Sequence, residues 1–114
     1  MSQNNHIDYI EFYAKDLDLI KTFYSACFNW KFTDYGANYT SFDSSGIKGG
    51  FEKTEADIVN GALIVLYHED IDSCLEKIKK AGATISKELF SFPGGRRFQF
   101  LDPSGNELSV WTHK

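Results

Sequence analysis

GRRFQFLDPSGNEL, residues 95–108, is the stretch of the sequence that decides the fold. Aromatic residues at alternate positions in its first half are typical of a β-strand, over 96–101. Asp102-Pro103-Ser104-Gly105 then combines residue types that favour turns, and an apolar strand over 106–112 follows. The stretch therefore predicts two strands joined by a tight turn.

Two short matches elsewhere indicate that the sequence repeats one module. The turn at 102–105 matches Asp43-Ser44-Ser45-Gly46, which lies 59 positions earlier. The helix-capping Asp70 matches Asp16, which lies 54 positions earlier. Each match alone is weak because unrelated turns and caps reuse the same residues. Together, with the same order of predicted elements in each half, they indicate two copies of one module.

The periodicity of apolar residues predicts the order strand, helix, strand, strand, strand in both halves. Asp16 and Asp70 are suitable N-caps, and Asn29 and Gly82 tolerate the left-handed conformation that ends many helices. A helix on one face of each sheet leaves the other face free. The predicted strands cover 7–14, 30–33, 39–42, 47–53, 62–67, 83–90, 96–101 and 106–112, and the predicted helices cover 17–28 and the segment between Asp70 and Gly82.

The composition excludes several classes of protein. The 12 Lys and Arg against 16 Asp and Glu give a net charge of −4, without the basic cluster that nucleic-acid binding needs. No apolar run approaches the roughly 20 residues that cross a membrane, and residues 1–5 lack the apolar core of a secretory signal. Cys27 and Cys74 are too few for a disulfide framework. We therefore expect a cytoplasmic protein without a nucleic-acid or membrane partner.

The sequence as a whole resembles the vicinal oxygen chelate superfamily, which includes glyoxalase I, bleomycin-resistance proteins, extradiol dioxygenases and methylmalonyl-CoA epimerase. The resemblance implies an α+β fold of two tandem βαβββ modules that form a curved mixed sheet around a concave cleft, with the helices on the outer face. It also implies a homodimer. The modules would cover 6–53 and 62–112, joined by a linker at 54–61, in a single domain of residues 1–114. The segments that carry the resemblance are 12–17, 23–24, 28–30, 70–82 and 95–108.

The positions that bind metal in metal-dependent members carry unsuitable residues here. The resemblance implies four ligands, mostly His, Glu or Gln, one each from the first and last strands of the two modules. Counting from the two sequence matches places them at Tyr9, Gly50, Leu63 and Ser109. This set cannot hold a catalytic divalent cation, and a shift of one residue does not improve it. We therefore predict no metal site of the family type, no other cofactor and no extradiol dioxygenase activity.

Strand alternation predicts which side chains line the free faces. It places Glu11 between aromatic neighbours, where a carboxylate is unusual unless it is paired, binds a ligand or accepts a proton. Glu11 is therefore the candidate catalytic residue, although a solvated carboxylate or a structural ion pair explains the same pattern. The predicted ligand-binding residues on these faces are Tyr9, Tyr13, Glu52, Tyr67, Ser109 and Trp111.

Arg96 and Arg97 are neighbours in a predicted strand and therefore point to opposite faces. We expect one of them to reach the cleft, where a guanidinium can hold a carboxylate or phosphate through two hydrogen bonds. A structural ion pair with Glu11 or Glu107 is the alternative. Trp30 is a further aromatic residue that can either stack on a planar ligand or pack in the core.

Two hypotheses for the function follow from these residues. The first is a small-molecule binding protein of the bleomycin-resistance kind, which sequesters its ligand in an aromatic cleft without transforming it. The second is a metal-independent lyase or isomerase in which Glu11 removes a proton and Arg96 or Arg97 holds the resulting anion. A degenerate partner in a larger assembly is a third alternative. The sequence leaves open whether any reaction is catalysed.

Overall fold

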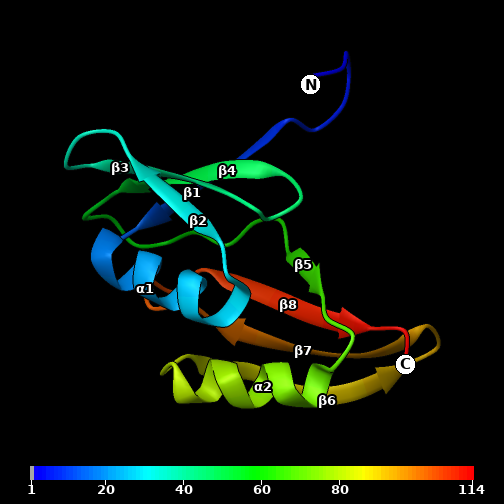
Figure 1. Ribbon diagram of the computed structural model, residues 1–114. Helices are drawn as coiled ribbons and strands as arrows, with labels where there is room; N and C mark the ends of the chain where they lie inside the picture. The colour runs from blue at the N-terminus through cyan, green and yellow to red at the C-terminus, as the bar shows by residue number, and fades with distance from the viewer. Residues whose placement is uncertain (1) are drawn as a thin grey trace. The chain divides into compact units, whose positions relative to one another are not determined.

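The computed structural model describes residues 2–114 and contains two compact units, one up to Asp57 and one from Ile58 to Lys114. Over this range each unit has one helix and four strands in the order β-α-β-β-β (Figure 1). The predicted α+β fold of two tandem βαβββ modules is therefore confirmed. The expectations that the modules form one domain and enclose a cleft stay predictions.

The first unit contains β1 (Tyr9–Ala14), α1 (Leu17–Phe28), β2 (Lys31–Asp34), β3 (Tyr39–Asp43) and β4 (Lys48–Lys53). Its strands form a mixed sheet in the order β1-β4-β3-β2. β1 runs parallel to β4, while β4 with β3 and β3 with β2 form antiparallel pairs. α1 connects β1 to β2 and lies along one face of this sheet (Figure 1).

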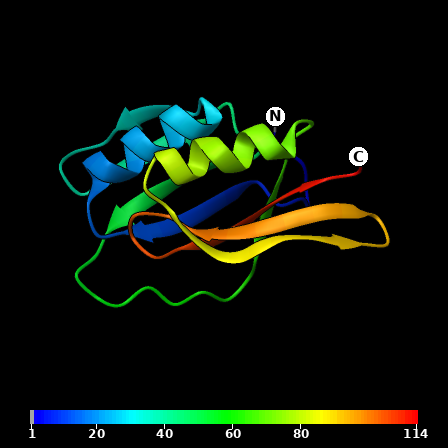
Figure 2. The ribbon, with the colours of Figure 1, turned by 90° about the horizontal axis from the view of Figure 1, so that it is seen from below.

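The second unit contains β5 (Ile64–Tyr67), α2 (Ile71–Lys80), β6 (Thr84–Phe92), β7 (Gly95–Leu101) and β8 (Glu107–Thr112). Its strand order is β5-β8-β7-β6, which repeats the topology of the first unit, with β5 parallel to β8. β6 and β7 form a long antiparallel hairpin whose strands lie side by side in Figure 2. The two units that the short sequence matches indicate therefore share the same order of elements and the same strand order.

Both helices begin at the residues that the sequence indicates, and α1 also ends where it is expected to, whereas α2 ends at Lys80 with Ala81 as its C-cap, one residue before Gly82. The Asp16 carboxylate accepts a hydrogen bond from the Leu19 N–H at 3.1 Å, and the Asp70 carboxylate accepts one from the Ser73 N–H at 3.2 Å. These bonds satisfy N–H groups that have no partner inside the first helical turn. Asn29 ends α1 in the left-handed conformation with φ 59°. Side chains alone therefore define the start of each helix.

Aromatic side chains fill the core between α1 and its sheet. Tyr24 of α1 stacks on Trp30 with 4.6 Å between the ring centres, and Trp30 stacks on Phe42 of β3 at 4.4 Å. Tyr24 also contacts Phe51 of β4, which stacks on Phe12 of β1. Trp30 is therefore a core residue, and the alternative that it stacks on a ligand is wrong because the ring is buried in this cluster.

Gly49 lets the strands beside this core approach one another closely. A Cβ atom at position 49 would overlap the backbone oxygen of Ile10 in β1 and the ring of Phe42 in β3. β4 therefore needs glycine here so that the aromatic cluster can pack against it.

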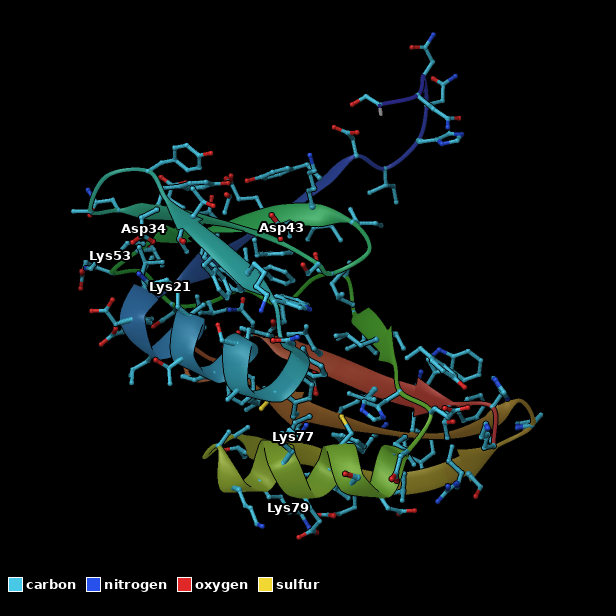
Figure 3. All side chains as sticks on the ribbon, in the orientation of Figure 1. Lys21, Asp34, Asp43, Lys53, Lys77 and Lys79 are labelled. Atoms are coloured by element: carbon cyan, nitrogen blue, oxygen red, sulfur yellow. The ribbon has the colours of Figure 1, made fainter. Side chains whose placement is uncertain are left out.

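An ion pair fastens α1 to the edge strand β2. The Lys21 ammonium donates to both oxygens of Asp34, at 3.0 and 3.1 Å (Figure 3). The hydrogen bond from Lys21 lowers the pKa of the Asp34 carboxyl group, and the same bond raises the pKa of Lys21. Because Asp34 is exposed, this pair orients the helix more than it stabilises the fold.

Neither of the helices described within residues 2–114 combines the length and apolarity that crossing a membrane requires. Cys27 of α1 and Cys74 of α2 are both buried on the packed side of their helices, and neither forms a disulfide.

The turn between β7 and β8 is built around a single carboxylate. One oxygen of Asp102 accepts hydrogen bonds from the N–H groups of Ser104, Gly105 and Asn106 at 2.9–3.0 Å. The other oxygen accepts one from the Asn106 side-chain amide at 3.0 Å. Since Asp102 is 4% exposed, removing it would leave several buried donors without a partner.

We therefore predict that Asp102→Ala lowers the free energy of unfolding by about 3 kcal/mol, measured by urea denaturation. The matched control is Asp43→Ala in the corresponding turn of the first unit, where the exposed Asp43 accepts a hydrogen bond from the adjacent Ser44 hydroxyl. This control should lose about 0.5 kcal/mol or less. Equal losses in the two variants would contradict this account of the turn.

Candidate functional site

Each sheet has one face that packs on its helix and one that points away from it. In β1 the side chains of Ile10, Phe12 and Ala14 lie on the helix side, whereas Tyr9, Glu11 and Tyr13 are exposed on the other side. We call the tyrosines and glutamates on the side of the first sheet that points away from α1 the tyrosine face. They are Tyr9, Glu11, Tyr13, Tyr39 and Glu52.

A chain of hydrogen bonds joins three residues at the centre of the tyrosine face. The Tyr39 hydroxyl donates to Oε1 of Glu11 at 3.0 Å and is also hydrogen-bonded to the Tyr9 hydroxyl. Tyr39 comes from β3 and reaches Glu11 of β1 across the intervening strand β4. Glycine at position 50 of β4 permits this crossing, because a Cβ atom there would overlap both tyrosine hydroxyls.

The environment of Tyr39 favours its neutral form. Burial raises the pKa of the Tyr39 hydroxyl, and its hydrogen bonds with Tyr9 and Glu11 raise the pKa further. Tyr39 therefore remains a hydrogen-bond donor at any physiological pH. The register places Glu52 directly between Tyr13 and Tyr39, so a second carboxylate lies on the same face.

The corresponding face of the second sheet is cationic and aromatic. We call it the arginine face. The strand register places four residues of this face in one row across the four strands. They are Tyr67, Trp111, Arg97 and Phe90. The Tyr67 and Trp111 rings meet edge to face at 5.5 Å, and the Tyr67 hydroxyl is hydrogen-bonded to the His113 ring at 2.8 Å. The arginine face comprises Tyr67, Lys87, Phe90, Phe92, Arg97, Trp111 and His113.

The two neighbouring arginines lie on opposite faces of β7, as the sequence predicts. Arg96 is on the side of α2, where its Nη1 lies 3.7 Å from a carboxylate oxygen of Asp72. Arg97 points the other way, with its guanidinium 5.3 Å from the centre of the Phe90 ring and 5.9 Å from that of Phe92. Arg97 is therefore the arginine that accompanies Tyr67 and Trp111.

Glu107 and Ser109, which share this side of β8, are engaged by neighbouring groups. Oε2 of Glu107 accepts hydrogen bonds from the Ser86 hydroxyl at 2.7 Å and the Gln99 amide at 3.0 Å. The Ser109 hydroxyl is buried and donates to the backbone oxygen of Phe98 at 2.9 Å.

The residues at the expected metal positions do not fit a divalent cation. The register pairs Gly50 with Glu11 in the first unit and Ser109 with Val65 in the second, while Leu63 precedes β5. The four expected positions offer a tyrosine hydroxyl, a glycine whose space two hydroxyls fill, an apolar residue and a serine bonded to the backbone, which together are a poor donor set. Among residues 2–114 no group of three or more His, Cys, Asp or Glu is placed to hold a metal. That the protein binds no metal stays a prediction.

Sequence reasoning did not select Tyr39, Phe90, Phe92, Lys87 or His113 as site residues. Tyr39 could not be found because the register of β3 against β4 is not visible in the sequence. Strict alternation would place Lys87 and Phe90 on opposite faces, but the pairing of β6 with β7 shifts register between them. With this shift, Lys87 and Arg97 both lie within 6 Å of the centre of the Phe90 ring.

A family model identifies the family to which the sequence belongs. The family model described as "Glyoxalase/Bleomycin resistance protein/Dioxygenase superfamily" matches residues 6–110. A comparison with curated protein sequences finds no match.

Several solved structures are similar in fold. A glyoxalase/bleomycin resistance protein/dioxygenase family enzyme from Burkholderia phytofirmans PsJN has a TM-score of 0.82 at 16% identity, covering 95% of this chain and all of that chain. The fosfomycin resistance protein FosX from Listeria monocytogenes has a TM-score of 0.83 at 18% identity, covering 96% of this chain and 94% of that chain. TioX from Micromonospora sp. ML1 has a TM-score of 0.75 at 18% identity, covering 96% of this chain and 100% of that chain.

These identities support a shared fold and leave the ligand open, because one fold hosts many chemistries. The family model, in contrast, spans nearly all of the sequence, and its match includes both repeated modules. The chain therefore belongs to the glyoxalase/bleomycin resistance protein/dioxygenase superfamily.

Proposed function

We propose that the protein binds a small organic molecule through aromatic side chains on the helix-free faces of its sheets, without a metal of the family type, and so serves sequestration or resistance. The observation that carries the proposal is the exposure of Tyr9, Tyr13 and Tyr67 on these faces, whereas the aromatic cluster on the helix side of the first sheet is buried. Exposed rings in such numbers are typical of sites that stack on a planar or apolar ligand.

A relative in the same family supports this kind of function. An E126Q mutant of the FosX protein from Listeria monocytogenes is described in complex with Mn(II) and 1S,2S-dihydroxypropylphosphonic acid, so that protein binds both a metal and a small organic molecule. In the present chain the donor set suits only the organic molecule, since Gly50 and Ser109 offer no free ligand group. Binding without metal chemistry favours sequestration over metal-assisted turnover.

Ligand binding is testable through the two tryptophans. Trp30 is buried in the core, whereas Trp111 is half-buried on the arginine face, so a ligand there should change the fluorescence of Trp111. We predict that a panel of aromatic acids, amides and amines contains compounds that quench this fluorescence and raise the Tm. At a ligand concentration one hundred times Kd the stabilisation should reach about 2.7 kcal/mol.

The matched variants for this test are Tyr67→Ala on the arginine face and Leu19→Ala on the exposed side of α1. Tyr67→Ala should weaken binding while Leu19→Ala leaves it unchanged. A panel that neither shifts the Tm nor changes the fluorescence would contradict the proposal.

A second candidate function is catalysis by Glu11 in a metal-independent lyase or isomerase. The observation that favours it is the hydrogen bond from Tyr39, which fixes one oxygen of the Glu11 carboxylate. A fixed carboxylate beside a neutral hydroxyl can remove a proton while the hydroxyl stabilises the charge that develops nearby. The same arrangement could bind a cation without catalysis. A measurement of turnover therefore distinguishes the two functions.

Glu11→Gln separates the two candidates because it keeps the shape and removes the basic group. If the protein sequesters its ligand, the wild type shows no turnover of small 2-oxo acids or glutathione adducts, and the variant binds cationic ligands more weakly. Turnover in the wild type that falls by about 100-fold or more in Glu11→Gln would instead establish Glu11 as the base. NMR detection of product measures this directly.

The raised pKa of Tyr39 gives a prediction about pH. The folded protein holds the Tyr39 proton more tightly than the unfolded chain does, so this contribution to stability is complete below about pH 10 and is lost as the pH rises further. Tyr39→Phe should therefore flatten the fall in stability above about pH 10 and leave the tyrosinate absorbance below about pH 11 unchanged. The matched control is Tyr35→Phe, which removes the hydroxyl of an exposed tyrosine instead. A drop in this absorbance in Tyr39→Phe would contradict the assignment.

A cytoplasmic location and a homodimeric state, both expected from the sequence, stay predictions beside this function.

A further inference from the structure

The guanidinium of Arg97 is a cation without a polar partner. Its Nε is buried and has no hydrogen-bond partner among residues 2–114, and no ion pair of Arg97 occurs in that range either. The groups beside it are the rings of Phe90 and Phe92. A guanidinium carries five N–H donors, and buried donors are rarely left without an acceptor.

Arg96, the neighbouring arginine, has acceptors for its N–H groups. It lies near Asp72, as described above, and its Nε donates to the backbone oxygen of Lys114 at 3.2 Å. The two residues share a strand and differ in the face to which they point. The lack of polar partners therefore belongs to the position of Arg97 on the arginine face and not to arginine in this strand as such.

A second cation lies near the same phenylalanine ring. The Lys87 ammonium lies 5.6 Å from the centre of the Phe90 ring, and no ion pair of Lys87 occurs among the described residues. The acid on this side of the sheet, Glu107, is already hydrogen-bonded to Ser86 and Gln99. Two positive charges thus share one ring without a counter-ion, in a chain whose net charge is −4.

The aromatic surroundings strengthen the attraction of these charges for an anion. Trp111 lies 6.4 Å from Phe92 and 5.5 Å from Tyr67, measured between ring centres, so the two rings beside the guanidinium continue into a larger aromatic cluster. Aromatic rings beside a cation reduce its contact with water on that side, which makes a charged hydrogen bond stronger than it is in bulk water.

We propose that the arginine face binds the oxyanion of a small aromatic organic acid, a carboxylate or a phosphonate, with Arg97 as its principal ligand-binding residue. The two terminal nitrogens of the Arg97 guanidinium, for which no acceptor occurs among residues 2–114, donate to two oxygens of the anion, and Lys87 contributes a second charge. The ring of the ligand lies against Trp111 and Phe92. This inference rests on the proposed small-molecule binding and specifies the chemical class of the ligand.

The experiment titrates the full chain, labelled with ¹⁵N, with benzoate, phenylphosphonate, neutral benzamide and cationic benzylamine. The Nε–H signal of Arg97 and the fluorescence of Trp111 are the two readouts. We expect both anions to shift the Arg97 signal and to bind about tenfold or more tightly than benzamide, and benzylamine to bind least. Comparing benzoate with phenylphosphonate shows which type of oxyanion is preferred.

Arg97→Gln and Arg96→Gln form a matched pair for this experiment. Arg97→Gln should weaken anion binding about tenfold or more and bring it to the level of benzamide. Arg96→Gln should leave anion binding unchanged, since Arg96 faces α2. Lys87→Gln should weaken binding by a smaller factor and reduce its dependence on salt. The unfolding transition of each variant shows whether it folds.

The outcomes separate the inference from the function on which it rests. If benzamide binds as tightly as the anions and Arg97→Gln has no effect, the oxyanion site is wrong while small-molecule binding stands. If none of the four compounds binds, this site is wrong and the broader proposal loses its support on this face. Loss of anion binding in Arg96→Gln but not in Arg97→Gln would also overturn the inference.

Discussion

The parallel pairing of the first and last strands of each unit is the constraint on which the other features depend. It fixes Glu11 opposite Gly50 in the first sheet and Tyr67 opposite Trp111 in the second. Because side chains alternate along a strand, one register decides every neighbour on both faces at once. A slip of one residue would bury Glu11 against α1 and expose Phe12. The hydrogen-bond chain of the tyrosine face and the aromatic row of the arginine face both need this pairing together with the antiparallel pairs beside it.

The elements were predictable from the sequence wherever a local signal defines them. Asp16, Asp70 and Asn29 set the helix ends because caps act within one turn, and α1 covers the predicted residues 17–28. Strand ends were less predictable. β5 begins at Ile64 rather than at residue 62, and β6 continues to Phe92 rather than ending at 90, because strand ends depend on a partner strand that no local pattern reveals.

The candidate site was predictable only in part. Alternation placed Glu11, Tyr67 and Trp111 on the helix-free faces because it needs no knowledge of neighbouring strands. It could not reveal that Tyr39 crosses β4 to reach Glu11, since this depends on the β3–β4 register and on an empty position in the middle strand. Nor could it assign Arg96 and Arg97 to their faces, which required the position of Asp72 on α2.

The adjacent glycines of β4 limit how the first unit can evolve. Gly49 is held by the packing of Phe42 and the backbone of β1, and Gly50 by the hydroxyls of Tyr9 and Tyr39. A coordinating imidazole or carboxylate at position 50 can be accommodated only after both tyrosines have been replaced or displaced. Each intermediate on that route loses the present cluster before it gains a ligand. A ligating side chain at position 50 therefore requires at least one compensating change in Tyr9 or Tyr39, so this position does not vary independently of its neighbours.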